Sequence, residues 1–151
     1  MRRSYFIAIA VAILAFLAIS ALLARVLSAN SAEQSAITAL IRAEAQGTPG
    51  AIIDDIAGCR ATAACRRRAT EVAATLQHPG TVSIIQLQPS TSFSVAGTLG
   101  TARVAWNVAG SLPIVQCVRV RRAGNAISGL RVELLEISPR IKSDSACPAL
   151  F

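Results

Sequence analysis

The sequence has few of the residues that catalysis and metal binding need. Its 151 residues include one histidine, His78, and 8 carboxylate side chains. It contains no G-x-S-x-G motif, no glycine-rich phosphate loop and no H-E-x-x-H motif. It also lacks a C-x-x-C pair, which argues against a zinc site. We therefore predict no catalytic residue, no metal and no cofactor.

Three further groups of ionisable residues have structural explanations. His78 precedes Pro79-Gly80, where it can bond the last carbonyls of a helix. The neighbours Asp54 and Asp55 point in different directions on a helix, so we expect them to face solvent and to favour the helix N-terminus. The run Arg66-Arg67-Arg68 forms a solvated helix face or, if that helix lies near a membrane, meets lipid headgroups.

A charge-free run from Tyr5 to Ala24 is the strongest signal in the chain. Twenty helical residues span about 30 Å, the thickness of the hydrocarbon core of a bilayer. We predict an anchor over residues 5–25. Because Arg2 and Arg3 precede the run, the positive-inside rule places residues 1–4 in the cytoplasm. Residues 26–151 then form one domain outside the cell membrane.

A cleaved signal peptide is the alternative interpretation of this run. The apolar part of a signal peptide is usually only about 7 to 15 residues long. The candidate cleavage site, Ala29-Asn30-Ser31, also lies behind the charged Arg25. An uncleaved anchor is favoured.

Four cysteines, Cys59, Cys65, Cys117 and Cys147, lie on the predicted exported side. Disulfides persist in such an oxidising compartment. Four cysteines allow three pairings, and proximity favours Cys59 with Cys65 and Cys117 with Cys147. The second bridge would pin the C-terminal tail onto a strand.

The net charge of +7 is distributed unevenly. Arg2, Arg3 and Arg25 flank the anchor, and five arginines balance five carboxylates between residues 31 and 78. The remaining excess falls in the C-terminal half. It predicts an acidic envelope protein, an anionic polymer or anionic lipid as a partner, and no nucleic acid, for a domain outside the cell.

Hydrophobic periodicity predicts helices first and strands afterwards. Three helices are expected from the capping box Ser31-Ala-Glu-Gln34 to Gly47, from Thr48-Pro49 to Gly58, and from Thr62 to Pro79. Four strands are expected at Val82–Gln88, Thr101–Val108, Pro113–Arg122 and Gly129–Ser138. The loop Pro89–Gly100 includes alternating Phe93 and Val95, which predict a short edge strand. This order indicates an α+β fold with the helices on one face of a mostly antiparallel sheet.

Alternation within the strands separates a core face from an outer face. Ala102, Val104, Trp106 and Val108 form the expected core row. Arg119 and Arg121 share the face of Cys117, and Arg122 is assigned to the fraying strand end. Two further arginines, Arg103 and Arg131, project from neighbouring strands. The arginines Arg103, Arg119, Arg121 and Arg131 either form cross-strand charge pairs or dock an acidic partner.

A short basic N-terminus, one anchor, helices and then a sheet ending in VELLEIS resemble the small single-pass proteins of actinobacterial envelopes. Members associated with mammalian-cell-entry lipid transporters have a cystatin-like or nuclear-transport-factor-like exported domain. The resemblance implies an accessory or scaffolding role. The predicted function is a disulfide-stabilised, non-catalytic interaction domain. The alternatives are binding of a lipid or small apolar ligand near Trp106, and a hydrolase or isomerase with acid/base groups inside the cone.

Overall fold

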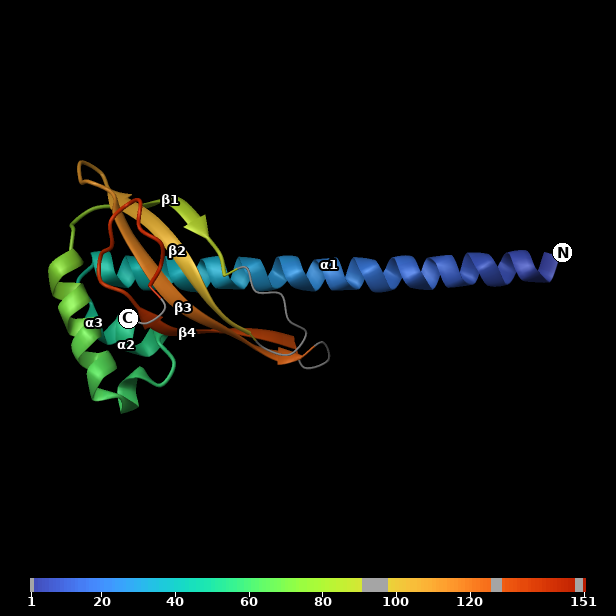
Figure 1. Cartoon of the computed structure of the whole chain (residues 1–151), viewed down its shortest axis with the longest axis horizontal. Coiled ribbons are helices and arrows are strands. Elements are labelled where there is room, and N and C mark those ends of the chain that lie inside the picture. Colours follow the sequence, from blue (N-terminus) through green and yellow to red (C-terminus); the bar gives the residue numbers. More distant parts are fainter. Residues whose placement is uncertain (1, 91–97, 126–128, 149–150) are drawn as a thin grey trace.

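The computed structural model describes residues 2–90, 98–125, 129–148 and 151, and it confirms the α+β fold (Figure 1). A long helix is followed by two shorter helices with a 3₁₀ turn between them, and then by four strands. Their bounds are α1 Arg2–Ala45, α2 Pro49–Asp55, η1 Cys59–Ala61, α3 Ala63–Leu76, β1 Val82–Gln88, β2 Thr98–Val108, β3 Ile114–Asn125 and β4 Gly129–Ile137.

The predicted anchor and the predicted first helix are one helix, α1. No break occurs at Ser31, so the capping box does not act as a helix start, which corrects the prediction of separate helices. The segment between Ala24 and Gln34 contains neither glycine nor proline, so nothing in the backbone interrupts the helix. Its stretch Phe6–Ala24 is long and apolar enough to cross a membrane and is not buried in the protein.

The α1 helix ends at Ala45, and Gly47 follows with a φ of +66°, a left-handed conformation that glycine adopts without strain. Thr48 N donates to Ala43 O, which satisfies a terminal carbonyl. Pro49 then begins α2, as predicted, although the Thr48 side chain does not cap that helix. Asp54 and Asp55 are exposed as expected, but they lie in the last turn of α2 and not near its N-terminus.

The four strands form an antiparallel sheet in the order β1-β2-β3-β4. The predicted meander is therefore confirmed. Strands β2 and β3 are each three residues longer than predicted at their open end, beginning at Thr98 and ending at Asn125. The predicted edge strand at Phe93 and Val95 lies outside the described residues.

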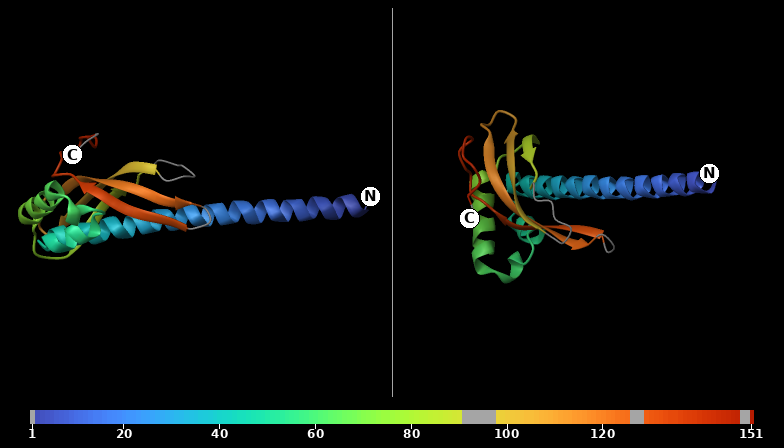
Figure 2. Two further views of the ribbon diagram at one scale, coloured as in Figure 1. Left: turned by 90° about the horizontal axis from the view of Figure 1, so that it is seen from below. Right: turned by 45° about the vertical axis from the view of Figure 1, so that its right-hand side comes forward.

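The helices cover one face of the sheet, and the core lies between the two layers (Figure 2). Ile37, Leu40 and Ile41 of α1 are fully buried there. The predicted core row of β2 is also buried; it comprises Ala102, Val104, Trp106 and Val108. The second half of α1 is thus the central helix of the domain as well as the continuation of its apolar N-terminal segment.

The segment after β4 continues beside β3 as far as Ile141 and then passes over the opposite, outer face of the sheet, where Arg103 donates to Ser143 O. Ile141 N donates to Val115 O, and Cys147 is bonded to Cys117 with a Cα–Cα distance of 5.8 Å. Cys59 and Cys65 form the second disulfide, with a Cα–Cα distance of 5.2 Å. Both predicted pairings are confirmed.

Candidate functional sites

A buried ion pair ties α1 to the sheet. Glu33 is fully buried, and its Oε2 accepts bonds from Arg122 Nε at 2.9 Å and Nη2 at 2.6 Å. The two Glu33 oxygens also accept the Ser90 backbone N–H at 2.8 Å and the Ser90 hydroxyl at 3.0 Å. Arg122 Nη2 reaches Asn30 Oδ1 at 2.8 Å. These four residues, here the Glu33 cluster, join α1, β3 and the end of β1.

The position of Arg122 corrects its assignment to a fraying strand end. Because β3 continues to Asn125, alternation places Arg122 on the inner face with Val118 and Val120. Its side chain is only 12% exposed. Two local signals indicate this pair. The strand alternation, continued by one residue, turns Arg122 inward, and Glu33 lies four residues before Ile37 on the same helix face.

A second buried glutamate lies deeper in the same interface. Glu44 is fully buried, and Gln116 Nε2 donates to its Oε1 at 3.4 Å. Gln116 Oε1 accepts a hydrogen bond from Trp106 Nε1 at 2.8 Å, and Gln116 Nε2 also donates to Ser138 O at 3.2 Å. Glu44 Oε2 has no hydrogen-bond partner among the described residues. The four residues Glu44, Trp106, Gln116 and Ser138 are here the Glu44 cluster.

The surroundings of Glu44 favour its neutral form. Burial raises the pKa of Glu44 to about 8, and the opposing hydrogen bond from Gln116 lowers it by less. Near neutral pH the folded protein therefore carries mainly a protonated Glu44. Elsewhere, burial and then the Asp54 charge raise the pKa of the partly exposed Asp55.

A surface pocket of about 280 Å³, here the distal pocket, lies between the α2–α3 connection and β4. Its apolar lining includes Ile56, Ala69, Leu135, Ile137 and Phe151. It lies toward the end of the domain that is farthest from the N-terminus (Figure 1). A backbone bond from Ala57 N to Leu134 O, 2.7 Å long, joins its two sides.

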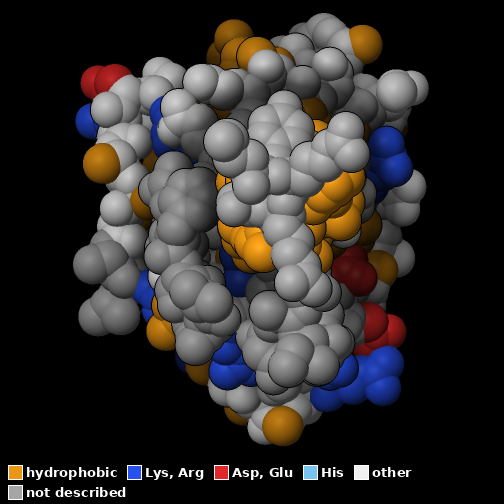
Figure 3. All heavy atoms as spheres, turned by 90° about the vertical axis from the view of Figure 1, so that its right-hand side faces the viewer, with side chains coloured by type: hydrophobic (Ala, Val, Ile, Leu, Met, Phe, Trp, Pro, Cys, Tyr) orange, Lys and Arg blue, Asp and Glu red, His pale blue; other side chains and the backbone are white. Residues whose placement is uncertain are grey.

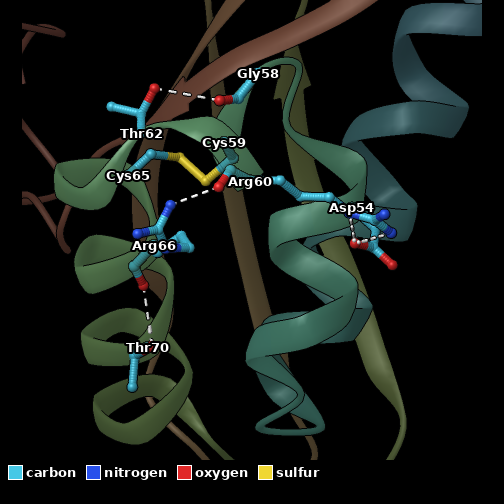
Figure 4. The surroundings of a disulfide bond; sticks show 8 residues. All are labelled: Asp54, Gly58, Cys59, Arg60, Thr62, Cys65, Arg66 and Thr70. Atoms are coloured by element: carbon cyan, nitrogen blue, oxygen red, sulfur yellow. Dashed lines mark hydrogen bonds and ion pairs between the residues drawn. A yellow bond between two sulfur atoms is a disulfide. The ribbon is translucent and has the colours of Figure 1, made fainter.

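The Cys59–Cys65 disulfide is shown in Figure 4. Both of its residues line the distal pocket. The disulfide links η1 to the first turn of α3, directly after Gly58, which turns the chain with a φ of +74°. The Thr62 hydroxyl donates to Gly58 O at 3.2 Å, and Arg60 pairs with Asp54 at 2.7 Å. These contacts fix the connection that shapes the pocket.

The predicted outer-face arginines do share one face. The register pairs Arg103 with Cys117, and Arg121 with Glu133. Arg119 Nη1 lies 2.9 Å from Glu136 Oε2 at the rim of the distal pocket, and its guanidinium lies 5.1 Å from the centre of the Phe151 ring. Arg121 forms an ion pair with Glu133, and Arg103 donates to Ser143 O in the tail.

Arg131 differs from the other three predicted arginines. It lies on β4, opposite Ala123 of β3, and its side chain is exposed. No ion-pair partner for Arg131 occurs within the described ranges, which exclude the turn at 126–128. The four outer-face arginines, here the basic band, are therefore partly charge-paired, as one of the two interpretations expected. Arg131 is available to bind an anionic group.

The remaining residues singled out from the sequence have structural contacts. His78 Nδ1 lies 2.9 Å from Leu76 O, and the His78 backbone N–H donates to Ala45 O at 3.0 Å, which joins the end of α3 to the end of α1. Arg66 donates to Arg60 O. Helix α3, which carries Arg66 and the two arginines that follow it, lies at the end of the domain away from the apolar helix segment (Figure 1).

Trp106, near which a ligand site was expected, does not line the distal pocket. Trp106 is fully buried, bonded to Gln116 and packed in the helix–sheet core. No group of three or more histidine, cysteine, aspartate or glutamate side chains suited to a metal occurs among the residues that the structure describes. The distal pocket and the outer face remain as candidate binding surfaces.

No protein-family profile, curated protein sequence or solved structure is significantly similar to this chain. The resemblance to actinobacterial envelope proteins therefore stays a prediction, and the function has to be argued from the site itself.

Proposed function

We propose that this chain is a membrane-anchored, non-catalytic interaction domain of the cell envelope, whose distal pocket receives an apolar segment of an acidic partner protein. The observation that carries the proposal is the continuity of α1, which extends without a break from Phe6–Ala24 into the core. From Ala24 to Ala45 the helix rises about 30 Å. A single stiff element thus holds the pocket at a set distance from the bilayer.

The Glu33 cluster supports an uncleaved anchor. Cleavage after Ser31 would remove Asn30, which binds Arg122, and would create a charged amino terminus at Ala32, directly before the buried Glu33. An intact α1 keeps both contacts. The two disulfides support an oxidising compartment for the domain, and Arg2 and Arg3 support a cytoplasmic position for the N-terminus through the positive-inside rule.

The lining of the distal pocket supports binding in preference to catalysis. Apolar side chains form most of the wall, whereas Arg68 and Glu136 contribute charge. Glu44, the described carboxyl group with the most strongly altered pKa, is fully buried and does not line the pocket. A substrate in the distal pocket would therefore not meet it, and an apolar side chain of a partner would fit.

The outer face supports an acidic partner. The chain has no carboxylate between Glu71 and Glu133, but five arginines lie in that interval. Arg119 lies at the rim of the pocket, while Arg103 and Arg121 continue the basic band beside it. A partner that inserts an apolar residue into the pocket would meet these guanidinium groups with its own carboxylates.

Binding of a small apolar ligand is the second candidate. A volume of about 280 Å³ is near the lower end of the range of ligand pockets, so the distal pocket would hold a small molecule or part of an acyl chain. Native mass spectrometry of the detergent-solubilised full chain would reveal a retained small ligand. A ligand signal that disappears when the pocket is filled would favour this candidate over a protein partner.

Site-specific photocrosslinking in native membranes tests the main proposal. A photoreactive amino acid replaces Ala57, which is exposed and lines the pocket. We expect a reproducible crosslinked protein that is lost when Ala64→Trp fills the pocket. The matched control is Ala74→Trp, an exposed position on the same helix that does not line the pocket.

Charge reversal separates the two parts of the proposed surface. Replacing Arg103, Arg119 and Arg121 by glutamate is expected to weaken crosslinking at Ala57. Unchanged crosslinking would eliminate the basic band as a docking surface. A crosslink that survives Ala64→Trp would eliminate the pocket.

A further inference from the structure

We propose that the end of the β3–β4 hairpin where Asn125 pairs with Gly129 binds the phosphate groups of anionic lipids in the leaflet from which the domain emerges. The inference rests on the anchoring part of the proposed function, and it is independent of what the distal pocket binds. It assigns a ligand to Arg131 and to the neighbouring Arg121, on the part of the hairpin that continues past Arg119 and away from that pocket.

The Glu33 cluster fixes the height of the hairpin above the membrane. Asn30 and Glu33 lie six and nine residues beyond Ala24, which corresponds to about 9 and 14 Å along α1. Arg122 binds both residues, so this point of β3 is held at that height. Helix α1 is continuous between the apolar segment and these two residues, so no flexible linker lies between the apolar segment and the point where the sheet is held.

Beyond Arg122 the hairpin continues toward the membrane. Strand β3 runs on to Asn125, where it pairs with Gly129 of β4. Three strand residues add about 10 Å. Both ribbon views show the hairpin running beside α1 toward the N-terminal end of that helix (Figures 1 and 2). The end of the hairpin therefore comes close to the level of Ala24, within the headgroup region that flanks the hydrocarbon core.

The charge at this end of the domain matches anionic phosphates. The hairpin segment from residue 121 to residue 132 contains three arginines and no carboxylate. Arg131 is exposed and has no ion-pair partner within the described part of the chain, whereas Arg121 is 50% exposed and pairs with Glu133, so Arg131 is the main contributor. Viewed from the N-terminal end of α1, Lys and Arg side chains are visible on several sides of the molecule, together with fewer Asp and Glu side chains (Figure 3).

The guanidinium group suits a phosphate because it donates parallel hydrogen bonds to two oxygens. Each basic residue close to an anionic membrane surface strengthens the interaction about fivefold. The attraction falls off within a Debye length of about 8 Å at physiological salt, so only groups close to the headgroups benefit. The attraction therefore acts on the basic residues at the hairpin end and not on those near the distal pocket, which lie farther from the headgroups.

Fluorescence quenching of the full chain in vesicles tests the proposal. A fluorescent amino acid replaces Ala123, which lies opposite Arg131 on the adjacent strand, or Ala109 in the turn at the other end of the sheet. The vesicles contain a lipid with a nitroxide on its headgroup, in either phosphatidylcholine alone or a mixture with phosphatidylglycerol. Arg131→Gln is the test variant, and Arg67→Gln, on the exposed face of α3, is the matched loss of one charge.

We expect the probe at position 123 to be quenched more strongly in phosphatidylglycerol vesicles, and the probe at position 109 to remain unquenched in both. Arg131→Gln should weaken the contact about fivefold, whereas Arg67→Gln should leave it unchanged. High salt should also weaken it. Equal quenching in neutral and anionic vesicles, or none in either, would overturn the proposal.

Extraction with alkaline carbonate distinguishes this failure from failure of the anchor. A chain that stays in the vesicles without quenching at position 123 refutes the hairpin contact alone. A chain that is released refutes the anchoring on which the hairpin contact and the proposed function both depend.

Discussion

The buried carboxyl group of Glu44 should make the folded protein less stable as the pH rises through neutrality. Burial raises the pKa of Glu44 in the folded state from 4.5 to about 8. Between these two values the folded state binds more protons than the unfolded state, so the free energy of unfolding decreases with increasing pH. The contribution is complete below about pH 4.5 and is lost as the pH rises through about 8.

The size of the effect follows from the difference between the two pKa values. A difference of about 3.5 pH units corresponds to a loss of about 5 kcal/mol across the whole window, at 1.36 kcal/mol per unit. This figure is an upper limit, because side chains and water rearrange around a charge that forms in the core. In the middle of the window the slope approaches about 1.4 kcal/mol per pH unit.

The variant Glu44→Gln isolates this contribution. The amide has nearly the same shape, can still contact Gln116, and does not titrate. We expect the stability of the natural chain to fall relative to that of the variant between pH 5 and 8. Urea unfolding of the detergent-solubilised full chain at several pH values measures the difference directly. Parallel stability curves for the two proteins would refute the raised pKa and the assignment of a buried, neutral carboxyl group.

Three further predictions concern stability. Arg122→Gln should destabilise the protein by about 3 to 5 kcal/mol because it leaves the buried Glu33 without its charge partner. The adjacent Arg121→Gln breaks an exposed ion pair and should cost under about 1 kcal/mol. Chemical denaturation of the two variants compares these losses. Cys147→Ser opens a disulfide across a separation of 30 residues and should cost about 3 to 4 kcal/mol, and a loss no larger than that of a surface serine substitution would contradict the stapling role. Trp106→Phe leaves the Gln116 amide oxygen without its donor and should cost about 1 to 3 kcal/mol, measured as a shift in the urea midpoint.

Local patterns in the sequence were sufficient for most of the secondary structure. Strand β1 has the predicted bounds, and the alternation of β2 identified its buried row correctly. Glycine and proline marked the ends of α2 and α3 because they disrupt helices through their own backbone geometry. The capping box at Ser31 misled the prediction because the same residues are compatible with a helix interior when no breaker accompanies them.

The candidate sites were less accessible to sequence reasoning. The four outer-face arginines were placed on the correct face, since alternation is a local property. Their partners were not predictable, because Glu136 and Ser143 reach them through strand register and the course of the tail. The distal pocket was missed altogether, since its walls come from segments that are more than 60 residues apart in the chain.

The sequence by itself therefore determined the apolar helix, the α+β order and the basic excess of the C-terminal half, and it favoured one of the three possible disulfide pairings. Each of these depends on the composition or spacing of neighbouring residues, or on the small number of cysteines available to pair. Only the tertiary structure decided that Arg122 turns inward to Glu33, that Glu44 is enclosed against Gln116, and that a pocket opens beside the Cys59–Cys65 bridge. The reason is physical: burial and ion pairing depend on which distant segments pack together, and that packing joins the end of an apolar helix to a sheet formed at the other end of the chain.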